Sequence, residues 1–230
     1  MTTIKDVRNI MRPVLERRPE LVLIGRRIFI KPVHHLLCGV SLGSSIDPKA
    51  FLTRKSVQLL VPNSWGYAGE GARYYEKYDL DQLRYWDITR PESMKQLVET
   101  TDAILTAFTA ITTLEDYFDY LRSIEWPWLH PVELIRAEAL IAVLNGDFEL
   151  ALNIFKKHPN LLWDYDQREP RFHQAILAGD RAEVIRILHD WEASSVKACK
   201  IERIWERTPF PLELTGPSDQ GGDSAPIAKI

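Results

Sequence analysis

The hydrophobic pattern of the first sixty residues changes its period once. From Ile4 to Leu15 the apolar residues recur every three or four positions, which predicts a helix with one apolar face. Pro13 is expected to kink this helix or to begin a second turn, and Pro19 marks its predicted end. After Glu20 the apolar residues gather into short runs rich in β-branched side chains, so the predicted structure changes from helix to strand.

These short runs predict a small antiparallel sheet. Their approximate ranges are 21–24, 26–33, 36–42 and 56–61. Gly25, Gly39, Gly43 and Pro48 are expected to lie at turns or bulges between or within the strands. Because the connections are too short for parallel crossovers, we expect three to five antiparallel strands with the first helix packed on them.

The middle of the chain predicts helices only. A loop with three glycines after Pro62 leads to a predicted helix over residues 72–83, and further helices are expected over 92–110 and 113–122. Thr113 is a candidate N-cap, since Glu115 and Asp116 follow it at the positive end of the helix. Two prolines in the segment 126–131 are expected to end this helix.

One short pattern occurs twice in the second half, thirty-three positions apart. It reads Ala142-x-Leu144-x-Gly146-Asp147 and later Ala175-x-Leu177-x-Gly179-Asp180. In each unit we expect a helix to end near the glycine and the aspartate to cap the next helix. The residues expected to be buried in the second helices are Leu150, Ala151, Ile154 and Phe155, and Val184, Ile185, Ile187 and Leu188.

Two interpretations of this pattern stay open. The period is near that of tetratricopeptide and ankyrin repeats, although neither full signature is present. The units, at about 132–158 and 170–191, are either repeat-like hairpins in a short bundle or unrelated hairpins whose turns coincide. Two units are fewer than a free-standing solenoid needs, so they must pack on the preceding helices.

The predicted fold class is therefore α+β. Residues 1–90 form an α+β module with an N-terminal helix and a small antiparallel sheet. Residues 91–215 form an α-helical bundle with the two repeat-like hairpins, and its last helix is expected over 193–207. Residues 216–230 are rich in Gly, Pro, Ser and Asp, and a disordered tail is predicted there.

Charge is unevenly distributed along the chain. The net charge is only −3, which argues against a protein that coats nucleic acid through bulk positive charge. Residues 1–60, however, contain eleven Lys and Arg against four Asp and Glu, whereas the rest of the chain has an acidic excess. The two parts are expected either to attract each other or to face different partners.

The cysteine count, the N-terminus and the apolar runs of the chain predict its localisation. There are only two cysteines, and the N-terminus lacks the combination of basic start, apolar core and small-residue cleavage site that marks a signal peptide. The longest apolar runs are interrupted by charges and fall short of the roughly 20 residues needed to cross a bilayer. We therefore expect a cytoplasmic protein that does not span a membrane.

The densest candidate for a contact surface is aromatic. Seven aromatic residues lie between positions 65 and 86, with basic residues among them. Such rings either pack between the sheet and the helical half, or form a hot spot for binding a protein, or stack on bases or sugars. The residues that we assign to partner binding are Trp65, Tyr67, Tyr74, Tyr78, Tyr85 and Trp86, together with Asp147 and Asp180 at the two Gly-Asp turns.

Candidates for chemistry are weaker. His34, His35 and Cys38 lie within five residues, but a structural zinc needs four ligands and the other cysteine, Cys199, is far away in the sequence. No serine lies in a Gly-x-Ser-x-Gly context, and no Gly-Lys-Ser or Gly-Lys-Thr follows the glycine-rich loop. We therefore expect no catalytic residue, metal or cofactor.

The N-terminal part resembles a family. The run from Gly25 to Gly39, followed by 44–48, is similar in its strand and turn texture to the start of uncharacterised bacterial α+β proteins, domains of unknown function found beside secreted toxins. The likeness covers about the first 65 residues. It implies a bacterial α+β module that acts as an immunity or accessory protein, and it implies no functional residues.

The predicted function is non-catalytic binding of another protein, as by an immunity or adaptor protein. One alternative is an enzyme whose site lies between the two halves and uses His34 or His35 with an acidic residue. Another is a nucleic-acid-binding module that uses the basic residues of the N-terminal part, which is the less favoured alternative. The sequence names neither the partner nor the oligomeric state.

Overall fold

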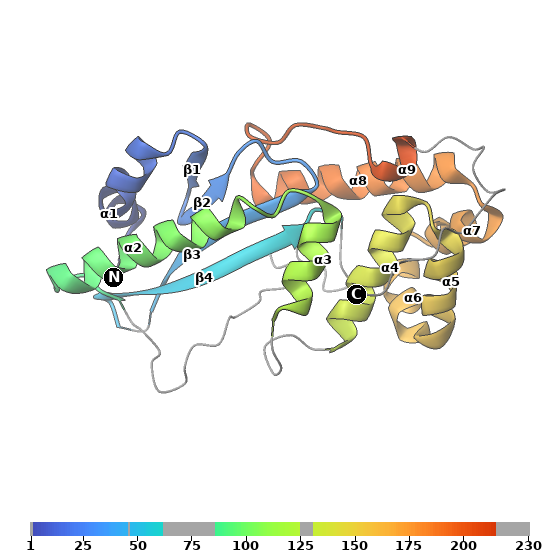
Figure 1. Ribbon diagram of the computed structural model, residues 1–230, viewed down its shortest axis with the longest axis horizontal. Coiled ribbons are helices and arrows are strands. Elements are labelled where there is room, and N and C mark those ends of the chain that lie inside the picture. Colours follow the sequence, from blue (N-terminus) through green and yellow to red (C-terminus); the bar gives the residue numbers. More distant parts are fainter. Residues whose placement is uncertain (1, 46, 62–85, 125–130, 215–230) are drawn as a thin grey trace, which may run out of the picture.

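The computed structural model describes residues 2–45, 47–61, 86–124 and 131–214. An N-terminal helix and a curled five-stranded sheet lie at one end, and most of the later helices lie at the other (Figure 1). The predicted α+β class is confirmed. The predicted helix 72–83 and tail 216–230 lie outside the described residues.

Helix α1, Ile4–Arg17, begins at a capping box. The Thr3 side chain accepts a hydrogen bond from the Asp6 amide, and the Asp6 carboxylate accepts one from the Thr3 amide at 2.6 Å. Pro13 lies inside the helix, which continues past it for one more turn. The buried residues of α1 share one face, as the apolar period predicts: Val7, Met11 and Val14.

The sheet is an antiparallel meander in the order β1-β2-β3-β4-β5. Its strands are Leu21–Ile24, Arg27–Ile30, Leu36–Ser44, Ala50–Leu59 and Trp86–Asp87. The β3–β4 pair is the longest, with register from Leu36 opposite Leu59 to Ser44 opposite Phe51. The predicted antiparallel sheet is confirmed.

Two glycines expected at turns or bulges lie at neither. Gly39 and Gly43 are both inside β3, where the pairing with β4 continues in register through them. Gly39 is opposite Phe29 of β2, and a Cβ atom built on Gly39 would lie 2.6 Å from the Phe29 ring. The glycine therefore gives the neighbouring aromatic ring its space within the strand pair.

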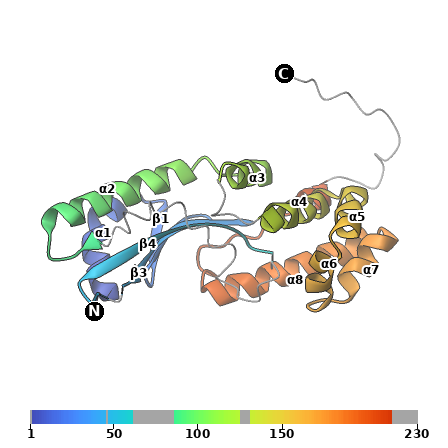
Figure 2. The same ribbon diagram turned by 90° about the horizontal axis from the view of Figure 1, so that it is seen from below.

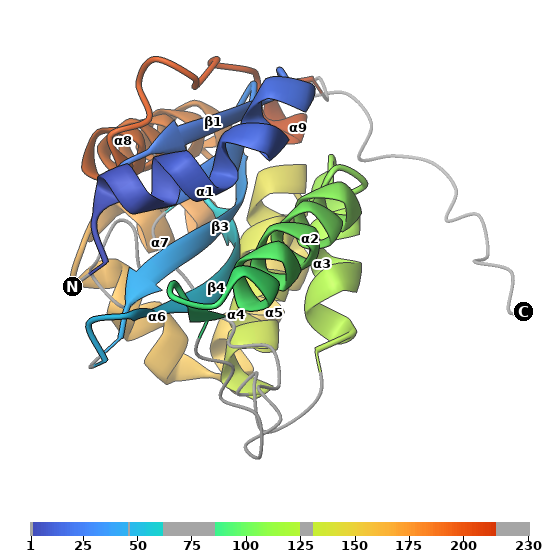
Figure 3. The same ribbon diagram turned by 90° about the vertical axis from the view of Figure 1, so that its left-hand side faces the viewer.

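Helices cover both faces of the sheet. Helix α1 and helix α2, Pro91–Phe108, pack on one face, where they share a buried cluster with β2, β3 and β4. The C-terminal end of α8, Arg181–Cys199, packs on the opposite face beside Phe29, Leu37 and Leu60. Figure 2 shows α2 and α8 on opposite sides of the strands, and Figure 3 shows α1 beside α2.

The remaining helices build the other end. They are α3 Leu114–Arg122, α4 Pro131–Asn145, α5 Phe148–Lys157, α6 Pro159–Asp166, α7 Arg171–Ala178 and α9 Pro211–Leu214. Thr113 caps α3 through a capping box with Asp116, as predicted. Hydrogen bonds from the Thr112 amide and from Thr113 lower the pKa of Asp116 to about 2, so this cap carries its charge at neutral pH.

The helix predicted over 193–207 is wrong. Residues 193–199 continue α8 without interruption, and the helix ends where Lys200 adopts a left-handed conformation with φ 59°. No glycine or proline separates the two predicted segments, so the helix has no reason to stop. Val196 and Cys199 are buried against the sheet, which extends the apolar face of α8.

Both Gly-Asp turns have the same geometry, as predicted. Gly146 and Gly179 have φ 81° and 66°, and the amide after each glycine donates to a carbonyl five residues earlier, at 2.9 and 2.8 Å. The carboxylates of Asp147 and Asp180 each accept a hydrogen bond from the backbone amide three residues later, at 3.0 Å. Whether the two hairpins are repeat units stays a prediction.

Two residues expected to be buried in these hairpins are not fully so. Ile185 is only partly buried, and the Leu150 side chain is 41% exposed. The buried residues of α5 are Ala151, Ile154 and Phe155, and Leu150 lies at the edge of this face, about 40° around the helix from Ile154 and about 140° from Phe155. The core face of α5 is therefore narrower than its apolar stripe.

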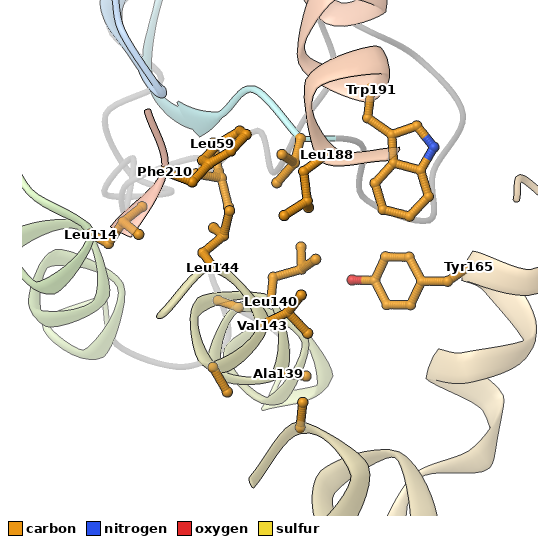
Figure 4. Packing of buried hydrophobic residues seen from close by; sticks show 14 of the residues in the cluster. Leu59, Leu114, Ala139, Leu140, Val143, Leu144, Tyr165, Leu188, Trp191 and Phe210 are labelled. Carbon is orange, nitrogen blue, oxygen red and sulfur yellow. The ribbon is translucent and has the colours of Figure 1, made fainter. Parts of the chain in front are cut away.

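The largest buried cluster joins the helical end to the sheet. In Figure 4, Tyr165 of α6 points its hydroxyl toward Leu140 and Val143 of α4, with Trp191 of α8 beside its ring. Leu59 of β4 belongs to the same cluster. Helix α2 belongs to the predicted helical domain but packs on the sheet; the domain boundary at residue 90 stays a prediction.

Within the described ranges, no helix combines the length and the apolar character that a bilayer crossing requires.

The two turn glycines form a matched pair for a stability test. We expect Gly179→Ala to lower the free energy of unfolding by about 1 to 2 kcal/mol, because a Cβ is unfavourable at positive φ and meets no atom within 4 Å there. Gly146→Ala should cost more, because its Cβ would also lie 2.9 Å from the Leu212 side chain. Urea unfolding of both variants measures the difference, and an equal or smaller loss for Gly146→Ala would contradict the packing of α9 on this turn.

Candidate functional site

An open groove runs between α1 and α2 on the surface of the sheet end. It has a volume of about 910 Å³. Most of its lining is apolar or small, and charged side chains stand at its edges. The lining residues are Ile10, Pro13 and Arg17 from α1, and Met94, Lys95, Val98, Glu99, Asp102, Ala103, Thr106 and Ala107 from α2.

One end of the groove is held by ion pairs. Arg18 Nη1 lies 2.9 Å from Asp102 Oδ1, and Arg17 Nη2 lies 3.3 Å from Asp102 Oδ2. Burial works against the charged form of Arg18, but hydrogen bonds to Glu20 and Asp102 outweigh it and raise its pKa. These contacts fix α1 against α2 and therefore fix the width of the groove.

The two walls of the groove differ in charge. Helix α1 carries four basic and two acidic side chains, whereas α2 carries three acidic and one basic. The charged side chains that line the groove itself are Arg17 on α1 and Lys95, Glu99 and Asp102 on α2. They surround an apolar floor.

Part of the predicted attraction between the basic N-terminal part and the acidic remainder is realised here. Asp102, from the acidic part, accepts hydrogen bonds from Arg17 and Arg18 of the basic part. Arg26, another basic residue of the N-terminal part, donates a hydrogen bond to the Thr2 carbonyl. These arginines serve contacts within the chain.

Most of the predicted aromatic surface is not described by the structure. Trp65, Tyr67, Tyr74, Tyr78 and Tyr85 lie outside the described residues. Trp86 lies in β5 opposite Phe51 and is 5% exposed, so its ring belongs to the core of the sheet. The use of this segment as a contact surface stays a prediction.

Asp147 and Asp180 lie at the surface, and each uses a carboxylate oxygen to cap its own helix. Their local role is structural, and a contact between either of them and a partner stays a prediction.

A second group of polar residues lies where β3, α8 and the C-terminal segment meet. His35 Nδ1 lies 2.8 Å from Glu192 Oε1, and His189 Nε2 lies 2.8 Å from Glu213 Oε1. The Phe210 ring lies between the two imidazoles, with centroid distances of 4.3 Å to His35 and 4.7 Å to His189. We call these five residues the histidine cluster.

The histidine cluster is built around a buried carboxylate. Glu192 is 0% exposed, although it lies on a helix whose neighbouring positions are apolar. His35 comes from a position 157 residues earlier. His35 was a candidate from the sequence, whereas Glu192 was not. The available signal for Glu192 was a charged residue between Trp191 and Val196 on the apolar face of α8.

Beside the histidine cluster, three side chains are arranged as in enzymes that use an activated hydroxyl as nucleophile. Thr208 Oγ1 lies 3.1 Å from His35 Nε2, so hydroxyl, imidazole and carboxylate follow in the order of a nucleophile, a base and its orienting group. The Pro209 carbonyl, however, lies 3.2 Å from the same Nε2 and competes as an acceptor for it. Catalysis at His34 or His35 stays a prediction.

The predicted absence of a metal site concerns His34, His35 and Cys38. His34 Nδ1 contacts the Glu206 carbonyl at 3.2 Å, and His35 binds Glu192, so both imidazoles are engaged. Over the ranges that the structure describes, no three His, Cys, Asp or Glu side chains are arranged to hold a metal ion. Burial raises the pKa of the Cys38 thiol to about 12.

Comparison of the chain with protein-family models, with curated proteins and with solved structures gave no match. The function is therefore argued from the geometry of the groove and of the histidine cluster.

The two cysteines test whether β3 and the end of α8 are packed in the core, because both thiols are buried there. Burial raises the pKa of both Cys38 and Cys199, so at pH 8 we expect the folded protein to react with a disulfide reagent such as DTNB at least a hundredfold more slowly than the urea-unfolded chain. Stopped-flow absorbance measures both rates. Fast reaction of either thiol in the folded protein would contradict its place in the core.

Proposed function

We propose that the chain is a non-catalytic protein-binding protein, such as an immunity or adaptor protein, and that the α1–α2 groove takes one amphipathic helix of its partner. The observation that carries this proposal is the apolar floor of the groove, which is open to solvent between two helices. Apolar surface of this kind is a frequent mark of interaction sites. Insertion of the apolar face of a helix into a groove is one of the recurring modes of peptide recognition.

The dimensions of the groove suit a helix. Its lining on α2 extends from Met94 to Ala107, which is about 20 Å along the helix axis, or between three and four turns. Ala103 and Ala107 are one turn apart, and their small side chains allow a second backbone to come close. A partner helix of similar length would place apolar residues at i, i+4, i+7 and i+11 into this floor.

The charges at the edges give the partner helix a defined orientation about its own axis. The side that faces α1 would carry Asp or Glu, because Arg17 lines that edge and is exposed. The side that faces α2 would carry a basic residue opposite Glu99 and an acidic residue opposite Lys95, because both line that edge. Complementary charges of this kind mainly raise the association rate and exclude wrong partners.

A displayed library tests this proposal without knowledge of the natural partner. A library of amphipathic helices with randomised flanks would be selected on the immobilised full-length chain. We expect the enriched helices to carry acidic residues on the flank that faces α1 and one acidic and one basic residue on the flank that faces α2. Their affinity, measured by interferometry, should fall at least tenfold in the double variant Ala103→Arg/Ala107→Arg, because each arginine places a charge on the apolar floor.

Ala193→Arg/Ala198→Arg is the matched control. Both alanines are exposed on α8 and line neither groove, so this variant makes the same two substitutions on a different helix. The control should bind within twofold of the unmodified chain. The proposal is wrong if the selection enriches no helix, or if the enriched helices bind the double variant as well as they bind the control.

A further inference from the structure

Three basic residues of α1 lie together on one exposed side of the helix. They are Lys5, Arg8 and Arg12. At about 100° per residue they fall within about 60° of one another around the helix axis, and they extend over about 10 Å along it. Ile10, which lines the α1–α2 groove, lies between about 140° and 160° from each of them. We call these three residues the basic stripe, and it is a surface separate from the groove.

Within the described ranges, the structure pairs no acidic side chain with the basic stripe. The Asp6 carboxylate is taken by the cap of α1, where it accepts hydrogen bonds. Glu16 follows Arg12 by one turn, but the side-chain contact that Arg12 makes among the described residues is to the Asn9 amide oxygen, at 3.4 Å. The basic stripe thus differs from the arginines at the end of α1, which contact Asp102.

These three charges lower the stability of α1. Lys5 and Arg8 are three positions apart, Arg8 and Arg12 are four apart, and like charges at these spacings repel each other on a helix surface. Lys5 also lies in the first turn, where the positive end of the helix disfavours a cation. An acidic partner would remove the repulsion and would contact all three side chains together.

Apolar residues at both ends of the basic stripe favour a protein segment as this partner. Ile4 is 48% exposed, and Leu15 is partly buried. They lie within about 20° of each other around the axis and about 16 Å apart along it. The phosphates of a nucleic acid carry no apolar groups for these side chains, and the net charge of −3 opposes the approach of a long polyanion. An acidic protein segment with apolar residues at its ends complements both features.

We infer that the basic stripe is a second docking surface, which binds an acidic helical segment of a protein along the outer side of α1. A helix laid along α1 has the same rise per residue, so apolar residues eleven positions apart would reach Ile4 and Leu15. Acidic residues between them, on the same face, would pair with the three basic side chains. The basic stripe would bind this segment whether or not the α1–α2 groove takes a helix.

Fluorescence anisotropy of the full-length chain with a labelled peptide tests this surface. The peptide has two leucines eleven positions apart, three glutamates between them on the same helical face, and alanine or glutamine elsewhere. We expect it to bind, and we expect its affinity to fall about tenfold in Lys5→Gln/Arg8→Gln/Arg12→Gln, because three exposed charge contacts are lost together. In urea unfolding this variant should have a midpoint equal to or above that of the unmodified chain, because the repulsion within α1 is gone.

The control for a general effect of charge is Lys156→Gln/Lys157→Gln/Lys197→Gln. These lysines are exposed, line neither groove and change the net charge by the same amount. They lie in the last turns of α5 and α8, where a cation is favourable. This variant should therefore keep the affinity for the peptide within twofold of the unmodified chain, whereas its urea midpoint should fall.

Four results would overturn the inference. The peptide could bind no more tightly than a peptide with glutamine in place of each glutamate, or the control could lose as much affinity as the variant of the basic stripe. A labelled single-stranded DNA of the same length could bind more tightly than the peptide, which would make the basic stripe a nucleic-acid surface. A lower urea midpoint for the variant of the basic stripe would show that these charges serve the fold.

Discussion

The pairing of β3 with β4 is the interaction on which the rest of the structure depends. Val40, Leu42 and Phe51 of this hairpin belong to the buried cluster under α1 and α2. Leu37, on the opposite face, belongs to the cluster under the end of α8. Leu59 belongs to the large cluster of the helical end. A shift of the register by one residue would exchange the faces and disrupt all three clusters together.

The segment after α8 returns to the strands of the sheet. Residues Val33 and Trp205 form an isolated bridge, and the Val33 amide donates to the Ile204 carbonyl at 2.8 Å. His35 lies one residue before β3 and contacts Glu192. The histidine cluster is thus built from segments far apart in the sequence, and it exists only when the sheet and α8 are both in place.

Local signals predicted the fold well where they are complete within a few residues. The cap at Thr113 and the Gly-Asp turns at 146–147 and 179–180 were correct, because each is decided by hydrogen bonds within about five residues. The error over residues 193–207 arose where no breaker marks a boundary and tertiary burial of Val196 extends the helix.

The candidate sites could not be predicted in the same way. The groove joins α1 to α2, whose contacting residues Arg17 and Asp102 are 85 positions apart. The histidine cluster joins His35 to Glu192 across 157 positions. No periodicity or short motif links residues that are so far apart in the sequence. Taken alone, the residues that each segment contributes to the groove or to the histidine cluster have a structural explanation. The packing of α1 and α2 on the sheet forms the groove, and the packing of α8 on the sheet brings Glu192 to His35.

The central claim is that the β3–β4 hairpin joins both ends of the molecule into one folding unit. Its most direct test is equilibrium unfolding in urea followed by NMR, with Leu42 of β3 and Leu144 of α4 as reporters of the two ends. The account predicts that both signals disappear with the same midpoint and the same dependence on urea. Loss of the Leu144 signal at a lower urea concentration, with the Leu42 signal intact, would contradict it.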